Sequence, residues 1–201
     1  MDTYKTITQP TEGIYKEKGS KFLAFALPVS TVEEVKEIVK NYKKEYYDAR
    51  HVCYAYMLGA ERKEFRANDD GEPSGTAGRP ILGQLNSREL TNILVIVVRY
   101  FGGILLGTGG LVVAYKEATA DALNQAEIIE KTEDETIIIN FDYILMNDVM
   151  RVIKDTSAQI LNQGYNNQCN MELSIRKQEV AILTSKLEKI IGVIVENEKS
   201  E

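Results

Sequence analysis

Histidine, cysteine and long apolar runs are all scarce in this sequence, and each scarcity removes a class of function. The single histidine, His51, excludes a zinc site built from several histidines and leaves at most one histidine-based acid–base role. The two cysteines, Cys53 and Cys169, are far apart in sequence, so we expect free thiols rather than a disulfide or a metal pair. We therefore expect neither a metal site nor a resident cofactor.

Segments that would address the chain to a membrane are also missing. No apolar signal-peptide core follows Met1, and the longest hydrophobic run is far too short to span a bilayer. We expect a cytoplasmic protein with no membrane role. Hydrophobic residues make up 44% of the 201 residues and charged residues 27%, which is ordinary for one large or two small globular domains.

The net charge of −6 is concentrated in the last third of the chain. Residues 1–128 carry 16 lysines and arginines against 17 acidic residues, whereas residues 129–201 carry 8 against 13. An acidic chain binds nucleic acid poorly without a local basic face. A helix predicted from a Thr31–Glu34 capping box to about Tyr46 offers one such face, which includes Lys43 and Lys44. The alternative is a solvated helix face balanced by neighbouring glutamates.

The strongest local pattern runs from Ile93 to Leu123. Its first six residues are apolar and mostly β-branched, which predicts a central strand covered on both faces. A glycine-rich loop follows, and then a helix with Ala114, Ala118 and Ala122 on one face. A strand, a glycine-rich turn and a helix N-terminus can together bind phosphate. The alternative is that these glycines only turn the chain and let the helix approach the sheet.

Residues 68–80 form a second loop that is rich in functional groups. Asp69, Asp70 and Glu72 could hold a hard cation, although their spacing fits no standard calcium loop. Ser74 could cap a helix running from about residue 76 to residue 85. The alternative is a capped, turn-rich connection. His51, at the start of a predicted strand, is either a hydrogen-bonded structural residue or an acid–base catalyst.

The last third of the chain predicts a small separate domain. Residues 128–134 are charged and lack a firm period, so we interpret them as a linker. The elements predicted over 135–201 follow in the order βαββαβ, which is that of a ferredoxin-like domain. Aromatic residues are few there and the charge is acidic, so we expect no RNA-stacking face on this domain.

Four motifs together resemble the YigZ/IMPACT family, densely over about residues 18–127. They are Ser20-Lys21-Phe22, the segment 49–56 (Ala-Arg-His-Val-Cys-Tyr-Ala-Tyr), the segment 69–80 (Asp-Asp-Gly-Glu-Pro-Ser-Gly-Thr-Ala-Gly-Arg-Pro) and Arg99-Tyr100-Phe101-Gly102-Gly103 continuing to Gly107-Thr108-Gly109-Gly110-Leu111. The resemblance implies an α+β chain in two parts. Residues 1–128 would resemble domain 2 of ribosomal protein S5, and residues 135–201 would form the ferredoxin-like domain, similar to the last domain of elongation factor G.

Both analogues touch ribosomal RNA, so the resemblance implies a non-enzymatic regulator linked to translation that contacts RNA or the ribosome. Arginines would engage phosphates, and Tyr100 could stack on a base. The glycines at positions 102 and 103 would let the RNA approach closely. The candidate contacts are Arg79, Arg99, Tyr100, Lys43 and Lys44.

Two alternatives remain. One is an enzyme or small-ligand binder in which Gly107, Thr108, Gly109 and Gly110 hold a nucleotide phosphate, the carboxylates of Asp69, Asp70 and Glu72 hold magnesium, and His51 acts as acid or base. The other is a protein-binding regulator that docks through its acidic second domain. The sequence leaves open the oligomeric state and whether loops 68–80 and 99–110 form one cleft.

Overall fold

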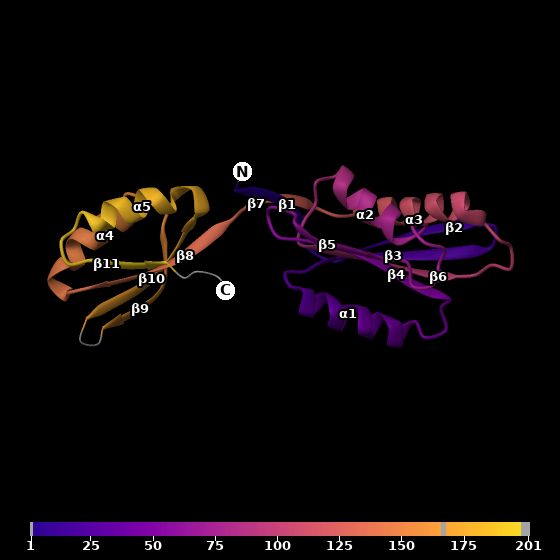
Figure 1. The fold of residues 1–201 in the computed structure, drawn as a ribbon, viewed down its shortest axis with the longest axis horizontal. Helices are drawn as coiled ribbons and strands as arrows, with labels where there is room; N and C mark the ends of the chain where they lie inside the picture. The colour runs from indigo at the N-terminus through magenta and orange to yellow at the C-terminus, as the bar shows by residue number, and fades with distance from the viewer. Residues whose placement is uncertain (1, 166–167, 198–201) are drawn as a thin grey trace. The chain divides into compact units, whose positions relative to one another are not determined.

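The computed structural model describes residues 2–165 and 168–197, and the chain divides into two compact units. Tyr4–Lys131 form the large unit. Thr132–Glu201 form the small unit together with the first three residues of the chain (Figure 1). Within the described residues, no helix is both long and apolar enough to cross a bilayer. Helices and sheets occur in both units, as expected for a mixed α and β chain.

The large unit is built on one five-stranded antiparallel sheet with helices on both faces. Helix α1 (Val32–Glu45) covers one face, and α2 (Gly78–Ser87) and α3 (Gly107–Asn124) cover the other (Figure 1). In spatial order the strands are β2 (Thr11–Glu17), β3 (Ser20–Pro28), β6 (Ile93–Tyr100), β4 (His51–Leu58) and β5 (Glu64–Asn68).

Strand β6 is the centre of this sheet, as its apolar run predicts. Its residues alternate between the two hydrophobic clusters that flank the sheet. Val95 and Val97 are buried in the cluster that includes α2 and α3, whereas Ile96 and Val98 are buried in the cluster that includes α1. A strand with both faces covered has no position for a polar side chain until its end, where Arg99 follows.

Helix α3 lies directly on the sheet because small residues meet at the contact. Ala114, Ala118 and Ala122 are all fully buried, which confirms the predicted small-residue face. On the sheet side the contact residue is Gly13, where an added Cβ would lie 2.2 Å from the backbone nitrogen of Ala122. No side chain larger than hydrogen fits at position 13 without moving the helix.

The segment 128–134, interpreted from the sequence as a linker between two domains, contains a strand. β7 (Ile128–Thr132) pairs with β1 (Thr3–Ile7) in a two-stranded sheet, and the Thr8 N–H donates to the Glu127 carbonyl beside it. The two units divide between Lys131 and Thr132, inside this segment, as the sequence predicted. The strand itself was missed because it gains its hydrogen bonds from the other end of the chain. Such distant pairing leaves no local period in the sequence.

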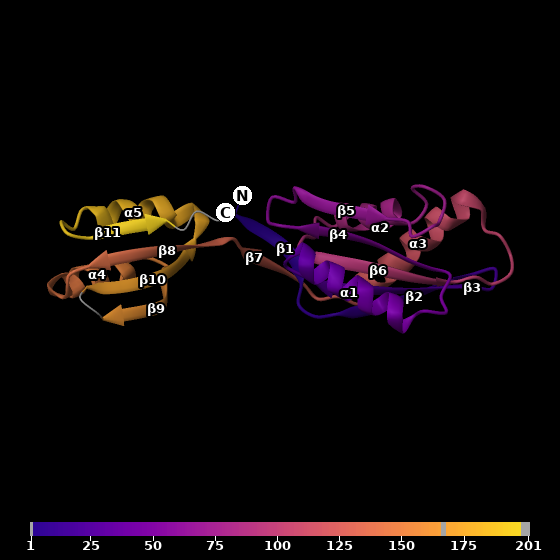
Figure 2. The ribbon, with the colours of Figure 1, turned by 60° about the horizontal axis from the view of Figure 1, so that its bottom comes forward.

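The small unit has a four-stranded antiparallel sheet with two helices on one face (Figures 1 and 2). Asp2 belongs to this unit: its carboxylate accepts from Arg176 Nε at 2.7 Å and from Nη2 at 3.1 Å, and its side chain is 3% exposed. In sequence order the elements are β8 (Asp134–Phe141), α4 (Met146–Lys154), β9 (Gln159–Tyr165), β10 (Cys169–Arg176), α5 (Val180–Glu188) and β11 (Ile194–Asn197). The spatial order of the strands is β11-β8-β10-β9. Short 3-10 helices lie at Tyr143–Leu145 and Lys177–Glu179.

Candidate functional site

The two loops singled out in the sequence meet in one cleft of about 550 Å³ in the large unit. The sheet register causes this convergence. His51 begins β4 directly opposite Arg99 at the end of β6, so both side chains leave the sheet at the same point. Loop residues 71–73 and the start of α3 close the cleft. The lining residues are Arg50, His51, Gly71, Glu72, Pro73, Arg99, Phe101, Leu105, Leu106, Gly107, Thr108 and Leu111.

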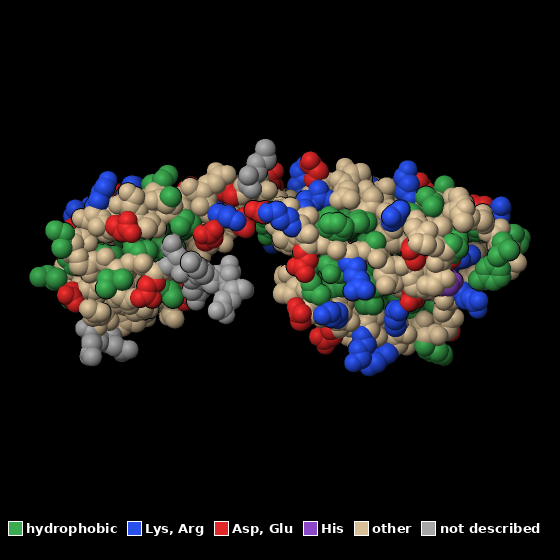
Figure 3. Space-filling view, in the orientation of Figure 1, with side chains coloured by type: hydrophobic (Ala, Val, Ile, Leu, Met, Phe, Trp, Pro, Cys, Tyr) green, Lys and Arg blue, Asp and Glu red, His purple; other side chains and the backbone are tan. Residues whose placement is uncertain are grey.

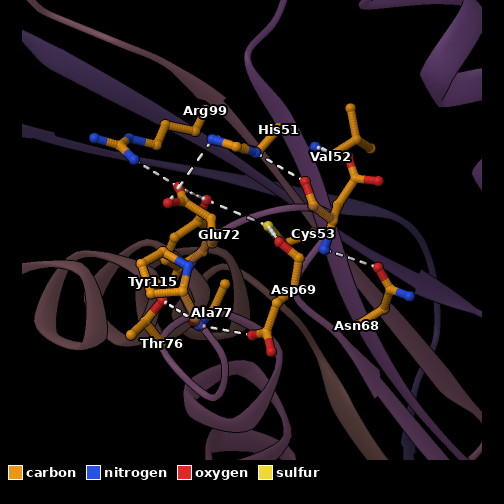
Figure 4. Close-up of polar contacts among 12 residues, drawn as sticks. His51, Val52, Cys53, Asn68, Asp69, Glu72, Thr76, Ala77, Arg99 and Tyr115 are labelled. Atoms are coloured by element: carbon orange, nitrogen blue, oxygen red, sulfur yellow. Dashed lines mark hydrogen bonds and ion pairs between the residues drawn. The ribbon is translucent and has the colours of Figure 1, made fainter. Parts of the chain in front are cut away.

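A buried ion pair between Glu72 and Arg99 forms one wall of the cleft (Figure 4). Glu72 Oε1 accepts from Arg99 Nη1 at 2.6 Å and from the Tyr115 hydroxyl at 2.8 Å. The two charged side chains are only 3% and 6% exposed. The guanidinium also lies near the rings of Phe22 and Phe101, at 5.5 and 5.7 Å from the centroids. A charge pair this buried is stable only when its geometry is fixed.

His51 is held in one orientation beside this pair. Its Nδ1 lies 2.8 Å from the Asp70 carbonyl oxygen, which can only accept, so Nδ1 carries the proton. In the neutral imidazole Nε2 is therefore an acceptor. Nε2 lies 3.8 Å from Glu72 Oε2, which is beyond hydrogen-bond distance. His51 Nε2 and Glu72 Oε2 therefore face each other, but no hydrogen bond joins them.

Asp69 caps α2 and takes no part in the cleft. Its two carboxylate oxygens accept from the backbone N–H groups of Gly75, Ala77 and Gly78 at 2.8, 3.1 and 2.8 Å. Burial opposes ionisation, but these three backbone bonds outweigh it and hold the pKa of Asp69 below its ordinary value. The predicted cap, Ser74, is exposed and makes no capping bond to α2. The prediction was wrong because the cap comes from nine residues before Gly78.

Asp70 is likewise committed to the large unit's own structure. Its Oδ2 accepts from the Val52 N–H at 2.7 Å, its Oδ1 pairs with Lys43, and its own N–H donates to Asn68 Oδ1. The three acidic residues of this loop therefore face three different sets of partners. Among the described residues, no group of three or more potential ligand side chains is arranged to hold a metal ion, so the arrangement does not support magnesium binding here.

Cys53 and Tyr115 complete a buried polar network that the sequence analysis missed. The Cys53 thiol donates to the Asp69 carbonyl at 3.0 Å and lies 3.3 Å from the Tyr115 hydroxyl. Burial raises the pKa of both groups, so each stays protonated at neutral pH. Cys53 is a buried free thiol, as predicted, and its role is to support the loop that carries Glu72. In the sequence, the only feature that pointed to the buried position of Cys53 was its place in a predicted strand.

The remaining predicted residues lie in neighbouring depressions or outside them. Lys43, Lys44 and Asp70 line a depression of about 480 Å³ beside α1. Tyr100, whose hydroxyl donates to Asp48, lines a third of about 670 Å³ together with Arg50, His51, Asp70 and Phe101. Seven of the candidates line none of these three depressions, namely Asp69, Ser74, Arg79, Gly102, Gly103, Gly109 and Gly110.

The cleft also includes residues that the sequence analysis did not select as site residues. Arg50 and Phe101 are exposed neighbours of His51 and Tyr100, and Leu105, Leu106 and Leu111 give the cleft an apolar wall. In the sequence, their position beside predicted site residues was the feature that could have indicated that they line the cleft. A charged and an apolar wall in one concave site are typical of a cleft that binds an organic ligand.

Comparison with known proteins matches both the motifs and the fold. The family model described as the Impact N-terminal domain matches residues 18–123. IMPACT family member YigZ of Escherichia coli (strain K12) is 33% identical over 93% of this chain and 93% of its own, and IMPACT family member YvyE of Bacillus subtilis (strain 168) is 32% identical over 89% and 82%. A crystal structure of a hypothetical protein, 31% identical, covers both chains completely with a TM-score of 0.75. The chain belongs to the IMPACT family.

Proposed function

We propose that this protein is a non-enzymatic, translation-linked binding protein of the cytoplasm that holds single-stranded RNA on its large unit. The observation that carries the proposal is the continuity of the three depressions. The cleft shares Arg50, His51 and Phe101 with the third depression, which in turn shares Asp70 with the depression beside α1. A continuous surface path of this kind suits an extended strand better than a duplex.

The basic and aromatic side chains along this path also support single-stranded RNA as the ligand. Arg50 stands at the junction of the cleft and the third depression, and Tyr100 and Phe101 offer aromatic rings beside it. Cations that follow a backbone, interleaved with aromatic rings, are the usual combination in single-strand binding. Basic side chains also gather over α1 (Figure 3). Those that line the depression beside α1 are Lys36, Lys40, Lys43 and Lys44.

We also infer that the small unit is ferredoxin-like and that the large unit resembles domain 2 of ribosomal protein S5. The order βαββαβ with spatial order β11-β8-β10-β9 supports a ferredoxin-like small unit, whose two inner strands are its first and third. A sheet with α1 on one face and α2 and α3 on the other supports the S5-like assignment of the large unit. The translation link rests on the family resemblance and on the contact of both analogues with ribosomal RNA.

The test is the salt dependence of RNA binding by variants of exposed cations. We expect the wild-type protein to bind a fluorescent single-stranded RNA of about 12 nucleotides with an affinity that falls as salt rises. Lys40→Ala and Arg50→Ala should each reduce the slope of log K against log salt by about 0.7, the value for one lost phosphate contact on a single strand.

Lys116→Ala is the matched control, since Lys116 is exposed on α3 and lines none of the three depressions. It should leave the slope unchanged. Arg99 is unsuitable for this test, because its buried pair with Glu72 means that its removal disturbs folding. Binding that shows no salt slope, or the same slope in all three variants, would contradict the proposal.

A small phosphorylated ligand is the second candidate, and the shape of the cleft favours it. The cleft volume lies within the range of small-molecule sites, and Gly107 and Thr108 bring the N-terminus of α3 to its edge. A thermal-shift series with inorganic phosphate and nucleoside mono-, di- and triphosphates tests it. No stabilisation by any of them at millimolar concentration would exclude this candidate.

A further inference from the structure

Two hydrogen-bond acceptors, His51 Nε2 and Glu72 Oε2, face each other in the cleft. Glu72 Oε1 is occupied by Arg99 and Tyr115, whereas Oε2 makes no hydrogen bond to any described residue. In the neutral form of His51, Nε2 is an acceptor, because Nδ1 donates to the Asp70 carbonyl. Nε2 and Oε2 lie 3.8 Å apart, so one donor group placed between them can reach both. A ligand that carries two N–H groups on one nitrogen can therefore donate to both atoms.

We propose that this acceptor pair recognises the exocyclic amino group of an unpaired nucleobase held in the cleft. This inference rests on the proposed RNA binding and adds a base preference to it. An amino group brings two N–H donors on one nitrogen, so a single group can serve two neighbouring acceptors. A carboxylate accepting from the N4 amino group of cytosine is a known mode of base recognition.

The remaining walls of the cleft fit the rest of a nucleotide. Phe101 is 48% exposed, so its ring can stack on a base, and Leu105 and Leu106 supply further apolar surface. Arg50 and the first N–H groups of α3 provide positive potential for the attached phosphate. The cavity of about 550 Å³ has room for one nucleotide and is too confined for a base pair with its backbones.

Glu72 is unusually well fixed for this task. Arg99 and Tyr115 hold Oε1, and the Cys53 thiol lies behind Tyr115. The carboxylate thus cannot turn away when a wrong base enters. Uracil and hypoxanthine carry a carbonyl oxygen where cytosine and adenine carry the amino group, and that oxygen would face two acceptors. The cleft thereby discriminates a base from its deaminated counterpart.

The test compares RNAs that differ only in this group. Single-stranded oligo(C) and oligo(U) of equal length should differ about tenfold in affinity for the wild-type protein, with oligo(C) bound more tightly, and replacing adenine by hypoxanthine in a mixed sequence should weaken binding similarly. Glu72→Gln presents an amide that can donate to a carbonyl oxygen, so it should reduce the difference between oligo(C) and oligo(U) to about twofold or less.

A second measurement needs no variant, because His51 is the only histidine in the sequence. Its imidazole resonances in the NMR spectrum therefore report binding beside His51 without overlap from another histidine. Cytidine monophosphate should shift the Nε2 resonance, whereas uridine monophosphate at the same concentration should leave it nearly unchanged. This readout decides the inference even when Glu72→Gln fails to fold.

The outcomes separate the two proposals. Salt-dependent RNA binding with equal affinity for oligo(C) and oligo(U) overturns the base preference and leaves the RNA proposal standing. Failure to bind any RNA overturns the proposed function. In that case a His51 shift with the cytidine nucleotide alone supports base recognition in the cleft, and equal shifts or no shift with both nucleotides overturn it.

Discussion

Arg99 and Glu72 meet through a single oxygen: Arg99 Nη1 donates to Glu72 Oε1 at 2.6 Å, and Tyr115 donates to the same atom. The other carboxylate oxygen is left to the cleft. Glu72 therefore links the interior of the large unit to its candidate ligand site. Arg99 Nε has no hydrogen-bond partner among the described residues, and the guanidinium carbon lies 5.5 Å from the Phe22 ring centroid and 5.7 Å from that of Phe101.

Removing the cation of this pair should be costly. We expect Arg99→Met to lower the free energy of unfolding by about 3–5 kcal/mol, because Glu72 would be left as an unpaired buried charge. Urea unfolding measures the change. The double variant Arg99→Met/Glu72→Gln should be less destabilised than the sum of the single changes. Strict additivity would show that the two groups do not interact.

The Tyr115 hydroxyl should contribute measurably to stability. We expect Tyr115→Phe to lower the free energy of unfolding by about 2 kcal/mol, since it removes a buried hydrogen bond to a carboxylate. Tyr15→Phe is the control, because the Tyr15 hydroxyl makes only a long 3.4 Å bond to Glu17 and should cost less than about 0.5 kcal/mol. Equal effects in urea unfolding would argue against the importance of the Tyr115 contact.

Asp69 should make stability depend on acidic pH. Its folded pKa is depressed below 3.8. Its stabilisation is therefore fully present above that value and is lost as pH falls through the folded pKa. We expect Asp69→Asn to be about 1–2 kcal/mol less stable than wild type at neutral pH, since the amide cannot accept all three backbone bonds. When unfolding is measured from pH 7 downward, the difference in the free energy of unfolding between wild type and Asp69→Asn should become smaller below about pH 4. A difference that does not change with pH would contradict the role of the Asp69 carboxylate as the cap of α2.

Two glycines near the cleft should respond oppositely to alanine. A Cβ at Gly102 would lie 1.9 Å from the backbone carbon of Gly19, so we expect Gly102→Ala to cost more than about 2 kcal/mol and to displace loop 101–106. Gly109, in the first turn of α3, has open space around its Cβ position. We expect Gly109→Ala to be neutral or to stabilise by up to about 1 kcal/mol. Thermal unfolding of the two variants compares them directly.

Both thiols should be unreactive in the folded protein. Cys53 and Cys169 are buried, and burial raises the pKa of Cys53, so little thiolate is available for alkylation. We expect a thiol reagent to label neither residue quickly at mildly alkaline pH and to label both once urea has unfolded the chain. Rapid labelling of Cys53 without unfolding would show that the loop carrying Glu72 opens.

Elements with a clear sequence pattern were predicted well. The apolar run at Ile93 gave the central strand, and the Thr31 cap of α1 forms as expected, with Thr31 Oγ1 accepting from the Glu34 N–H at 3.2 Å. Both depend on interactions between close neighbours in sequence. The motifs also located the two loops that form the cleft, although only their three-dimensional placement showed that they meet.

The contacts that define the chemistry of the site could not be predicted. Glu72 and Tyr115 are 43 residues apart, and no local period relates them. The sequence also presented Asp69, Asp70 and Glu72 as equivalent carboxylates. Their environments differ completely, because one caps a helix, one pairs with Lys43 and one joins Arg99. Such differences arise from tertiary packing and not from residue type.

The ion pair between Asp2 and Arg176 has a consequence for the order in which contacts form during synthesis. The two residues are 174 positions apart, so during synthesis Asp2 must wait for 174 further residues before its partner is made. At about 5–20 residues per second this delay is on the order of 10–30 seconds. Until then Asp2 lacks its ion pair, so the small unit completes its contacts only after Arg176 has been made.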